Sequence, residues 1–174
     1  MIRPIAFLLS LAVCLAGCGQ TPEDKAVSAI LKLGGTVERA KGVLWRPVVG
    51  VDLANPGITD ASLKELKELK GLKYLDLAYT QITDAGLKDL KELKGLQSLW
   101  LTNTKITDAG LKDLKALKGL RHLDLGSTQI TDAGLTDLKE LKDLRSLDLS
   151  GTKITRAGLS DLEQALPGTY IEGP

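Results

Sequence analysis

A 24-residue unit recurs along most of this chain and constrains its fold more than any other feature. The unit starts at Leu72 and returns with few changes from Leu96 and Leu120, with a fourth copy from Leu144 and a degenerate first copy from Val48. One copy is too short to be a domain, and alone it would leave both sides of its apolar layer in water. Stacked copies bury these layers against each other, so the period predicts a solenoid. Because a solenoid presents a broad surface and not a deep pocket, the repeat favours binding as the function.

The composition narrows the classes of function. The chain has 174 residues, of which 43% are hydrophobic but only 3% aromatic, so an aliphatic core built mostly of leucine is expected. Lys and Arg total 23, and Asp and Glu total 22. This balance argues against sequence-independent nucleic-acid binding, which needs a basic excess on one face. One His and two Cys leave little material for a structural zinc site, and no cofactor is expected.

The first 20 residues differ from the rest of the chain and have the layout of an export signal. Arg3 gives a positive start, residues 5–15 are apolar except for one Ser, and residues 15–18 read Leu-Ala-Gly-Cys. The apolar stretch is too short for a comfortable membrane span. Leu-Ala-Gly-Cys resembles the lipobox of bacterial lipoproteins, which implies cleavage before Cys18 and diacylglycerol on its sulfur. An ordinary signal peptide with an incidental Cys and a short membrane anchor are the alternatives.

The lipoprotein interpretation divides the chain into three parts and predicts its location. Residues 1–17 are the signal peptide, 18–47 hold the lipidated Cys18, a short linker and a helical cap, and 48–174 are a repeat domain of about five repeats with a C-terminal cap. The protein is expected in a bacterial cell envelope, on the exported side of a membrane (periplasm or surface), attached only through its lipid. Cleavage would also remove Cys14, so no disulfide is expected.

The N-terminal cap is predicted because an unshielded solenoid end would leave a leucine layer in water. A helix is expected over 21–32, with Thr21 as its cap residue and Pro22 at its first position. Residues 36–39 predict a short strand, and a turn at 41–42 leads to a second strand at 43–45. Trp45, in that second strand, is expected to pack within the cap.

Two periods alternate within each repeat. Leu75 and Leu77 are spaced for one side of a short strand. Leu87, Leu90 and Leu93 recur every three residues, as in a short helix or 3₁₀ segment with one buried face. The lysines between these leucines predict a solvated outer face.

Several polar positions of the repeat are interpreted as structural. Thr83 or Asp84 is placed to cap the helical segment. Another threonine recurs at the bend after the strand, where its hydroxyl can bond the backbone: Thr80, Thr104, Thr128 and Thr152. Residues 169–172 predict a short final strand.

The pattern Leu72-x-x-Leu75-x-Leu77-x-x-Thr80-x-Ile82-Thr83-Asp84-x-Gly86-Leu87 resembles a leucine-rich repeat, over about residues 48–166. The segment I-T-D-A-G-L is similar to the cysteine-containing subclass, with Thr where Asn or Cys usually stands. The N-terminal region also resembles secreted planctomycete repeat proteins, in which L-G-G-x-V leads to V-V-G-V-D-L. The resemblance implies an α/β solenoid, a horseshoe segment with parallel strands on the concave face and short helices on the convex face. It implies little about the ligand, because this repeat serves many unrelated binding roles.

Alternation along the strands predicts two exposed rows across the concave face. With Leu75 buried, Tyr74 and Asp76 point outward, and strands about 4.8 Å apart align such residues across the sheet. The first row is Gly50, Tyr74, Ser98, His122 and Ser146, and the second is Asp52, Asp76, Trp100, Asp124 and Asp148. Just past the strands follow Asn55, Tyr79, Asn103, Ser127 and Gly151.

Trp100 is the informative departure from the repeat, because it replaces a recurring Asp at the centre of the second row. An exposed aromatic ringed by polar groups is typical of an anchor for a protein or a sugar ring. The alternative is that Trp100 only covers an apolar patch. The candidate binding residues are Tyr74, Asp76, Tyr79, Trp100, Asn103, His122 and Asp124.

Catalysis and metal binding are the weaker interpretations of the same rows. Ser98, His122 and Asp124 permit a Ser-His-Asp arrangement across strands, yet nothing in the sequence indicates an oxyanion hole. The row of aspartates is a candidate for calcium because like charges about 5 Å apart repel. Lys73, Arg121 and Arg145 are close enough in sequence to neutralise it instead, so neither a catalytic nor a metal site is predicted.

The favoured function is therefore non-catalytic recognition by a lipid-tethered envelope protein, with a protein as partner and a glycan as the second ligand class. The alternative is a structural role in which repeat domains pack against one another or against the cell wall. A small hydrolase using Ser98, His122 and Asp124 is the remote alternative. The sequence does not predict an oligomeric state.

Overall fold

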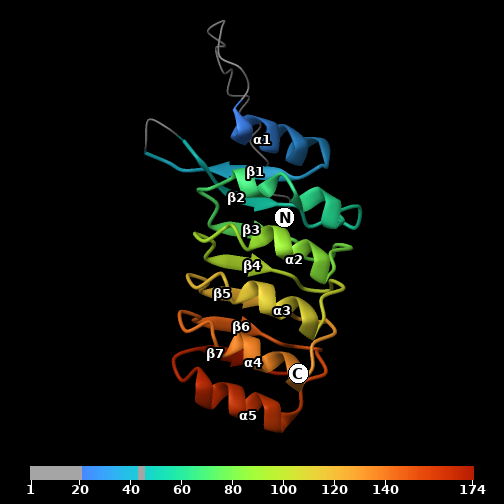
Figure 1. The fold of residues 1–174 in the computed structure, drawn as a ribbon, viewed down its shortest axis with the longest axis vertical. Helices are drawn as coiled ribbons and strands as arrows, with labels where there is room; N and C mark the ends of the chain where they lie inside the picture. The colour runs from blue at the N-terminus through green and yellow to red at the C-terminus, as the bar shows by residue number, and fades with distance from the viewer. Residues whose placement is uncertain (1–20, 43–45) are drawn as a thin grey trace, which may run out of the picture.

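The strands of the repeats stack side by side along the long axis of the molecule (Figure 1). The computed structural model describes residues 21–42 and 46–174. Seven strands form one sheet in chain order. They are β1 Thr36–Arg39, β2 Val48–Asp52, β3 Tyr74–Asp76, β4 Ser98–Trp100, β5 His122–Asp124, β6 Ser146–Asp148 and β7 Tyr170–Glu172. Strands β2 to β7 are parallel, as the solenoid requires.

A short helical segment follows each strand of the repeats and returns the chain to the next strand. The α-helices are α1 Pro22–Lys32, α2 Asp84–Leu90, α3 Asp108–Leu114, α4 Leu135–Leu138 and α5 Arg156–Ala165. The 3₁₀ segments are Asp60–Leu63, Leu66–Glu68 and Asp132–Gly134. Thr83 caps α2, because its hydroxyl oxygen accepts a hydrogen bond from the Ala85 N–H at 3.2 Å. Of the two cap candidates in the sequence, the structure thus selects Thr83.

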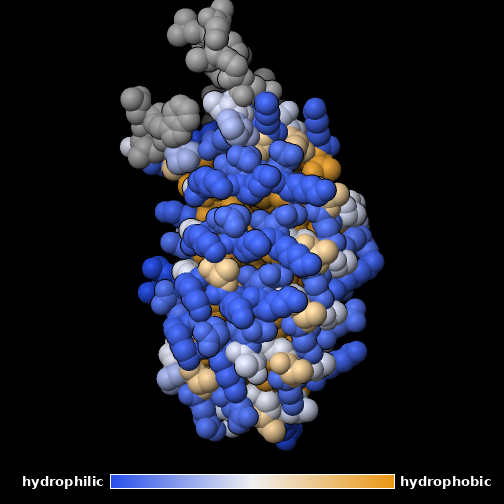
Figure 2. Space-filling view, in the orientation of Figure 1, coloured by the Kyte–Doolittle hydropathy of each residue, from blue (hydrophilic) through white to orange (hydrophobic). Residues whose placement is uncertain are grey.

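The leucines at equivalent positions of successive repeats stack in columns, and these leucine columns form one continuous core between the strands and the helices. In the second copy Leu75, Leu77, Ile82, Leu87 and Leu90 are fully buried. The lysines between the leucines are exposed, and Figure 2 shows hydrophilic side chains over most of this view, with narrow hydrophobic seams between them. Along residues 21–42 and 46–174, no helix combines the length and the apolar character needed to cross a membrane.

A carboxylate from one repeat holds a threonine of the next. Asp84 accepts a hydrogen bond from the Thr107 N–H at 2.8 Å and another from the Thr107 hydroxyl at 2.6 Å. The same pair of bonds recurs as Asp60 with Thr83, Asp108 with Thr131, and Asp132 with Thr155. The hydrogen bond from the Thr155 hydroxyl lowers the pKa of Asp132, and the weaker effect of the Thr155 N–H lowers it further. These bonds explain why Thr-Asp recurs in the repeat.

The glycine of the I-T-D-A-G-L segment leaves room for this bridge. A Cβ at Gly86 would lie only 2.5 Å from Asp60 Oδ1, and a Cβ at Gly134 would lie 2.5 Å from Asp108 Oδ1. Gly110 and Gly158 are crowded in the same way by Asp84 and Asp132. The glycine is therefore required by the approach of the neighbouring repeat.

The recurring threonine at the bend has the structural role predicted for it. The Thr80 hydroxyl donates to the Leu77 carbonyl at 2.7 Å within a buried bend. Thr104, Thr128 and Thr152 donate to the equivalent carbonyls. Each bond satisfies a carbonyl at the point where the strand ladder stops.

The N-terminal segment packs over the first repeat through α1 and β1. Thr21 caps α1 in a reciprocal capping box with Asp24, and the Thr21 hydroxyl lowers the pKa of Asp24. Ala26 and Ile30 are buried in the common core.

β1 has its partner within the first repeat. β1 pairs antiparallel with β2, the strand of the first repeat. The predicted strand at 43–45 and the packing of Trp45 lie outside the described residues, as do the predicted signal peptide and Cys18. The predicted short strand at the C-terminus is present as β7.

We expect Gly110→Ala to destabilise the protein by about 1–3 kcal/mol, because the added methyl group overpacks the site that Asp84 fills. Alanine would otherwise be favoured in a helix over glycine by about 1 kcal/mol, so the sign of the change is diagnostic. Gly119→Ala is the matched control, since a Cβ there meets nothing closer than 3.7 Å. Urea unfolding should show a change within about 0.5 kcal/mol for the control. Equal stability of both variants would contradict the close approach.

Candidate functional site

The two predicted rows of side chains cross the sheet in register. Tyr74 pairs with Ser98 and then His122, and Asp76 pairs with Trp100 and then Asp124. Leucines between the rows point into the core. We call the outward side of strands β1 to β7 the strand face. Residues that the sequence analysis missed extend its rows at the two ends: Thr36, Glu38, Tyr170 and Glu172. The pairing of β1 with β2 places the first two, and no repeat position encodes them.

The aspartates of the second row hold the backbone of the bend that follows each strand. Asp76 Oδ1 accepts a hydrogen bond from the Ala78 N–H at 2.9 Å. The same bond to the residue two positions on is made by Asp52, Asp124 and Asp148. Such local bonds are a standard use of Asp at a turn. Asp is therefore the structural default at this position.

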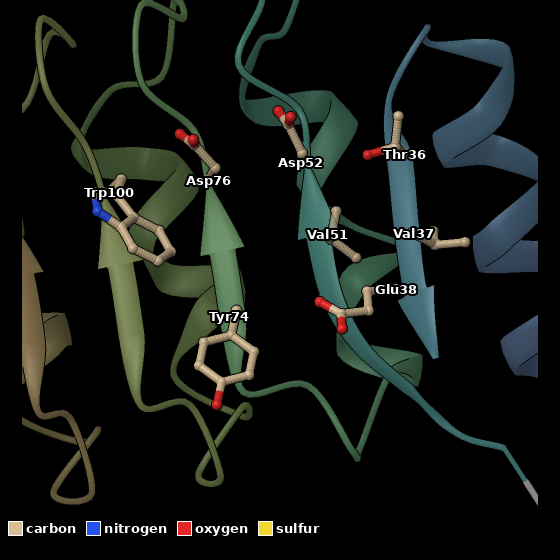
Figure 3. Close-up of a pocket in the computed structure, with 9 residues that line it drawn as sticks. Thr36, Val37, Glu38, Val51, Asp52, Tyr74, Asp76 and Trp100 are labelled. Atoms are coloured by element: carbon tan, nitrogen blue, oxygen red, sulfur yellow. The ribbon is translucent and has the colours of Figure 1, made fainter. Parts of the chain in front are cut away.

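Trp100 gives up this structural bond. Its indole N–H is a donor only, so the side chain cannot accept from the N–H of Thr102 two residues on. Trp100 is half-buried and lies in register between Asp76 and Asp124. Tyr74 on the adjacent strand has 42% of its surface exposed. Figure 3 shows the indole over β4 beside β3, with the ring of Tyr74 near the other end of β3.

The Trp100 side chain borders two shallow hollows in the strand face. The hollow toward the N-terminus, drawn in Figure 3, has a volume of about 230 Å³ and is also lined by Tyr74, Asp76 and Glu38. The hollow toward the C-terminus has a volume of about 250 Å³ and is lined by His122 and by acids that include Asp124 and Glu172. Trp100 is thus the wall shared by two hollows that are each lined by three acidic residues, and the one toward the N-terminus also contains Tyr74.

The strand face is electrostatically negative around Trp100. Partial burial raises the pKa of Asp76, and the nearby charges of Asp52 and Asp124 raise it further. The hydrogen bond from the Ala78 N–H opposes this shift. Burial is the largest of these causes, so the ionised carboxylate is less favourable here than in water.

Ser98 does not lie where a nucleophile would need to be. Its exposed fraction is 3%, and the larger Tyr74 and His122 flank it in the row. The prediction that every member of this row is exposed is therefore wrong at Ser98, and also at Gly50, which is buried in β2. Within the described part of the chain no hydrogen bond joins Ser98 to His122 or His122 to Asp124, and Asp124 instead accepts from the Gly126 N–H.

The row of aspartates does not form a metal centre. Among residues 21–42 and 46–174, no group of three or more His, Cys, Asp or Glu side chains is arranged to hold a metal ion. The Asp carboxylates of this row are already turned toward backbone N–H groups.

Tyr79 and Asn103 lie at a second place, just past the ends of the strands. Both line a hollow that does not include Trp100. Tyr79 has a φ of 60° and Asn103 a φ of 53°, so both backbones are left-handed. This conformation costs an L-residue roughly 1–2 kcal/mol and is easiest for Gly, Asn or Asp. The structure therefore divides the seven predicted binding residues between two surfaces.

The family model described as Zer-1-like leucine-rich repeats matches residues 63–169. No curated protein matches the chain significantly. The chain is similar to an internalin from Listeria monocytogenes, with 24% identity and a TM-score of 0.53, over 71% of this chain and 40% of the internalin. It is similar to the leucine-rich-repeat ectodomain of the receptor kinase SOBIR1 from Arabidopsis thaliana, with 22% identity and a TM-score of 0.50, over 88% and 96% of the two chains.

A leucine-rich-repeat protein of Leptospira interrogans is also similar, with 29% identity and a TM-score of 0.46, over 63% of this chain and 33% of that one. The chain thus spans less than half the length of the Listeria and Leptospira proteins. At these identities the internalin and the plant ectodomain show the fold, a solenoid with strands on one face and short helices on the other.

We expect Asp76→Asn to raise the melting temperature at pH 7, because Asn is uncharged and can still accept from the Ala78 N–H. The raised pKa means that ionisation of Asp76 disfavours the folded state, so wild-type stability falls as the pH rises through that pKa. The advantage of the variant should vanish by about pH 3, where the wild-type carboxyl is protonated. Thermal unfolding followed by circular dichroism from pH 3 to 7 tests this. A difference that is the same at every pH would contradict it.

Proposed function

The chain belongs to the leucine-rich-repeat family, and we propose that it recognises a protein partner through its strand face, with Trp100 as the central anchor. Leucine-rich-repeat domains generally act as protein-binding modules. The observation that carries the proposal is that Trp100 stands where the other repeats keep Asp52, Asp76, Asp124 or Asp148 for a structural hydrogen bond. A residue that gives up such a bond on an outward-facing row is better explained by binding than by folding.

The surroundings of Trp100 fit the centre of a protein interface. Tyr74 and Trp100 are large, rigid side chains on adjacent strands, and such residues dominate binding energy at interfaces. Shallow hollows of about 230 and 250 Å³ on either side of Trp100 would admit single side chains of a partner. The surrounding aspartates favour a partner whose patch carries Lys or Arg around an apolar centre.

The function proposed is binding without catalysis. Leucine-rich-repeat proteins are typically recognition modules without enzymatic activity. Ser98 is buried, and Asp124 accepts a hydrogen bond from the Gly126 N–H, so this pair does not favour a triad with His122.

We further propose that the domain works on the exported side of a bacterial membrane, tethered through a lipid on Cys18. The support is the sequence Leu15-Ala16-Gly17-Cys18 after a short apolar stretch. A lipoprotein cysteine carries more than one acyl chain, and two chains are sufficient for stable anchoring. Residues between the anchor and α1 would present the repeat domain close to the membrane surface.

We expect Trp100→Asn to weaken partner binding strongly while the protein stays folded, because Asn can accept from the bend N–H as Asp does in the other repeats. Photo-crosslinking from position Tyr74 in the envelope of the source organism first identifies the partner, with position Lys112 on α3 as the control. The affinity for that partner should then fall at least about 30-fold in Trp100→Asn, as for a central anchor.

Tyr79→Asn is the matched control, since it removes an exposed aromatic from the neighbouring hollow. It should leave the affinity for the protein partner unchanged. Equal adduct yields from Tyr74 and Lys112, or full affinity in Trp100→Asn, would refute the proposed face. Adducts made only to a second copy of the chain would support the structural alternative instead.

The lipid tether predicts a defined product when the full chain is expressed in a bacterium with its own N-terminus. Intact mass should show a chain that begins at Cys18 with added acyl mass, and the protein should fractionate with membranes. Cys18→Ser should prevent acylation. The variant should then either be released from the membrane fraction or remain unprocessed. An unacylated wild-type product, or one that retains residues 1–17, would rule out the tether.

A further inference from the structure

A second hollow, of about 540 Å³, lies past the ends of strands β3, β4 and β5 and takes no part in the site around Trp100. Its volume is within the range of about 300–1,000 Å³ that small-ligand sites span. We call its main lining the amide rim: Tyr79, Gln81, Asn103, Lys105, Ser127 and Gln129. These residues come from the same two positions of three successive repeats.

The backbone of the amide rim is held on both sides. The Tyr79 N–H donates to the Thr102 carbonyl at 2.8 Å, and Asn103 and Ser127 make the equivalent bonds. In the second column the Gln81 N–H donates to the Ile58 carbonyl at 2.9 Å, and Lys105 and Gln129 do the same one and two repeats further. The rim is therefore a fixed surface, with the backbone already set before any ligand arrives.

Tyr79 is an unfavourable choice for folding at its position. From the second copy of the repeat onward, the residues in its column have left-handed backbones, with φ values of 60° for Tyr79, 53° for Asn103, 55° for Ser127 and 68° for Gly151. Asn and Gly suit this conformation, whereas a bulky aromatic does not. The Tyr79 side chain gains little from burial in return, because 59% of its surface is exposed. An exposed aromatic kept in a strained place is a mark of a binding residue.

The amides of the rim are available to a ligand. In the first copy of the repeat, the Asn55 side chain accepts from the Gly57 N–H and donates to the Leu33 carbonyl. In the part of the chain that the structure describes, no such bond engages the side chains of Asn103, Gln81 or Gln129. Each of these amides offers a donor and an acceptor to the hollow.

The chemistry of the rim matches a neutral sugar. A pyranose has hydroxyl groups that both donate and accept, and an apolar ring face that can lie on an aromatic ring. The rim supplies amides and a hydroxyl beside one tyrosine, with Lys105 as its single charge. We propose that the amide rim is a glycan-binding site, in which Tyr79 stacks on a sugar ring and Asn103, Gln81 and Gln129 bond its hydroxyls.

The proposal is tested by recording amide NMR spectra of this ¹⁵N-labelled protein as a sugar is added. Three neutral probes are used: hexasaccharides of β-1,4-glucose, α-1,4-glucose and β-1,4-N-acetylglucosamine. At least one probe should shift the amide signals of Tyr79, Asn103 and Ser127, with saturation at or below about 10 mM. Tyr79→Gly should weaken this binding at least about tenfold and raise the melting temperature, because glycine relieves the left-handed strain. Tyr79→Asn gives the same test with a second residue that suits this backbone.

Two controls separate this site from the protein-binding face. Tyr170→Ala removes another exposed tyrosine, from β7, and should leave sugar binding intact. Trp100→Asn should also bind the sugar normally, so the glycan site can stand or fail without the proposed protein-binding function. The proposal is overturned if none of the three probes shifts the rim signals, if Tyr79→Gly and Tyr79→Asn bind as the wild type does, or if Trp100→Asn loses the sugar.

Discussion

From the second copy of the repeat onward, one threonine hydroxyl bonds each repeat to the preceding one, and the spacing of the stack depends on that contact. The Thr107 hydroxyl donates to Asp84 of the preceding repeat and accepts from the Ala109 N–H that opens α3. The same group therefore joins two repeats and starts a helix. This double role fixes the distance between repeats at the side where the helices begin, as the strand ladder fixes it on the strand face. Gly110 must leave room for the Asp84 carboxylate. The Thr, the Asp and the Gly of I-T-D-A-G-L are therefore all explained by the same close contact between neighbouring repeats.

The fold could be predicted from the sequence to a large extent because each structurally important position recurs in several copies of the repeat. The leucine columns, the threonine at the bend and the register of the strand face follow from a period of 24 residues and the alternation of a strand. The bridge between Asp84 and Thr107 could not be seen, because a Thr-Asp pair before a helix is also a sufficient local cap. The antiparallel pairing of β1 with β2 lies outside the repeat, so the period carried no information about it.

The candidate site was predicted less completely, for a related reason. A recurring Asp on an exposed row can have two roles that a sequence does not distinguish. It can offer a charge to ligands, or it can accept a hydrogen bond from a nearby backbone N–H. The bond from the Ala78 N–H to Asp76 shows the second role, and only coordinates distinguish the two. The separation of Tyr79 from Trp100 also needed the structure: Trp100 ends β4 and Tyr79 comes three residues after β3, yet the two side chains line different hollows. Likewise, the burial of Ser98 depends on the size of the residues beside it on other strands, Tyr74 and His122.

The repeat provides an internal standard for measuring what a departure costs. At the Trp100 position the standard is a carboxylate that holds a bend, and at the Tyr79 position it is a residue that tolerates a left-handed backbone. Each departure forfeits about 1 kcal/mol or more, a large amount for a marginally stable domain. Both stand in inner repeats, where a neighbour on each side fixes the backbone through bonds such as that from the Tyr79 N–H to the Thr102 carbonyl. At an end of the stack a strained residue would have one neighbour fewer and could relax. Interior repeats can therefore hold binding residues that are costly to the fold, which is where the structure places both proposed sites.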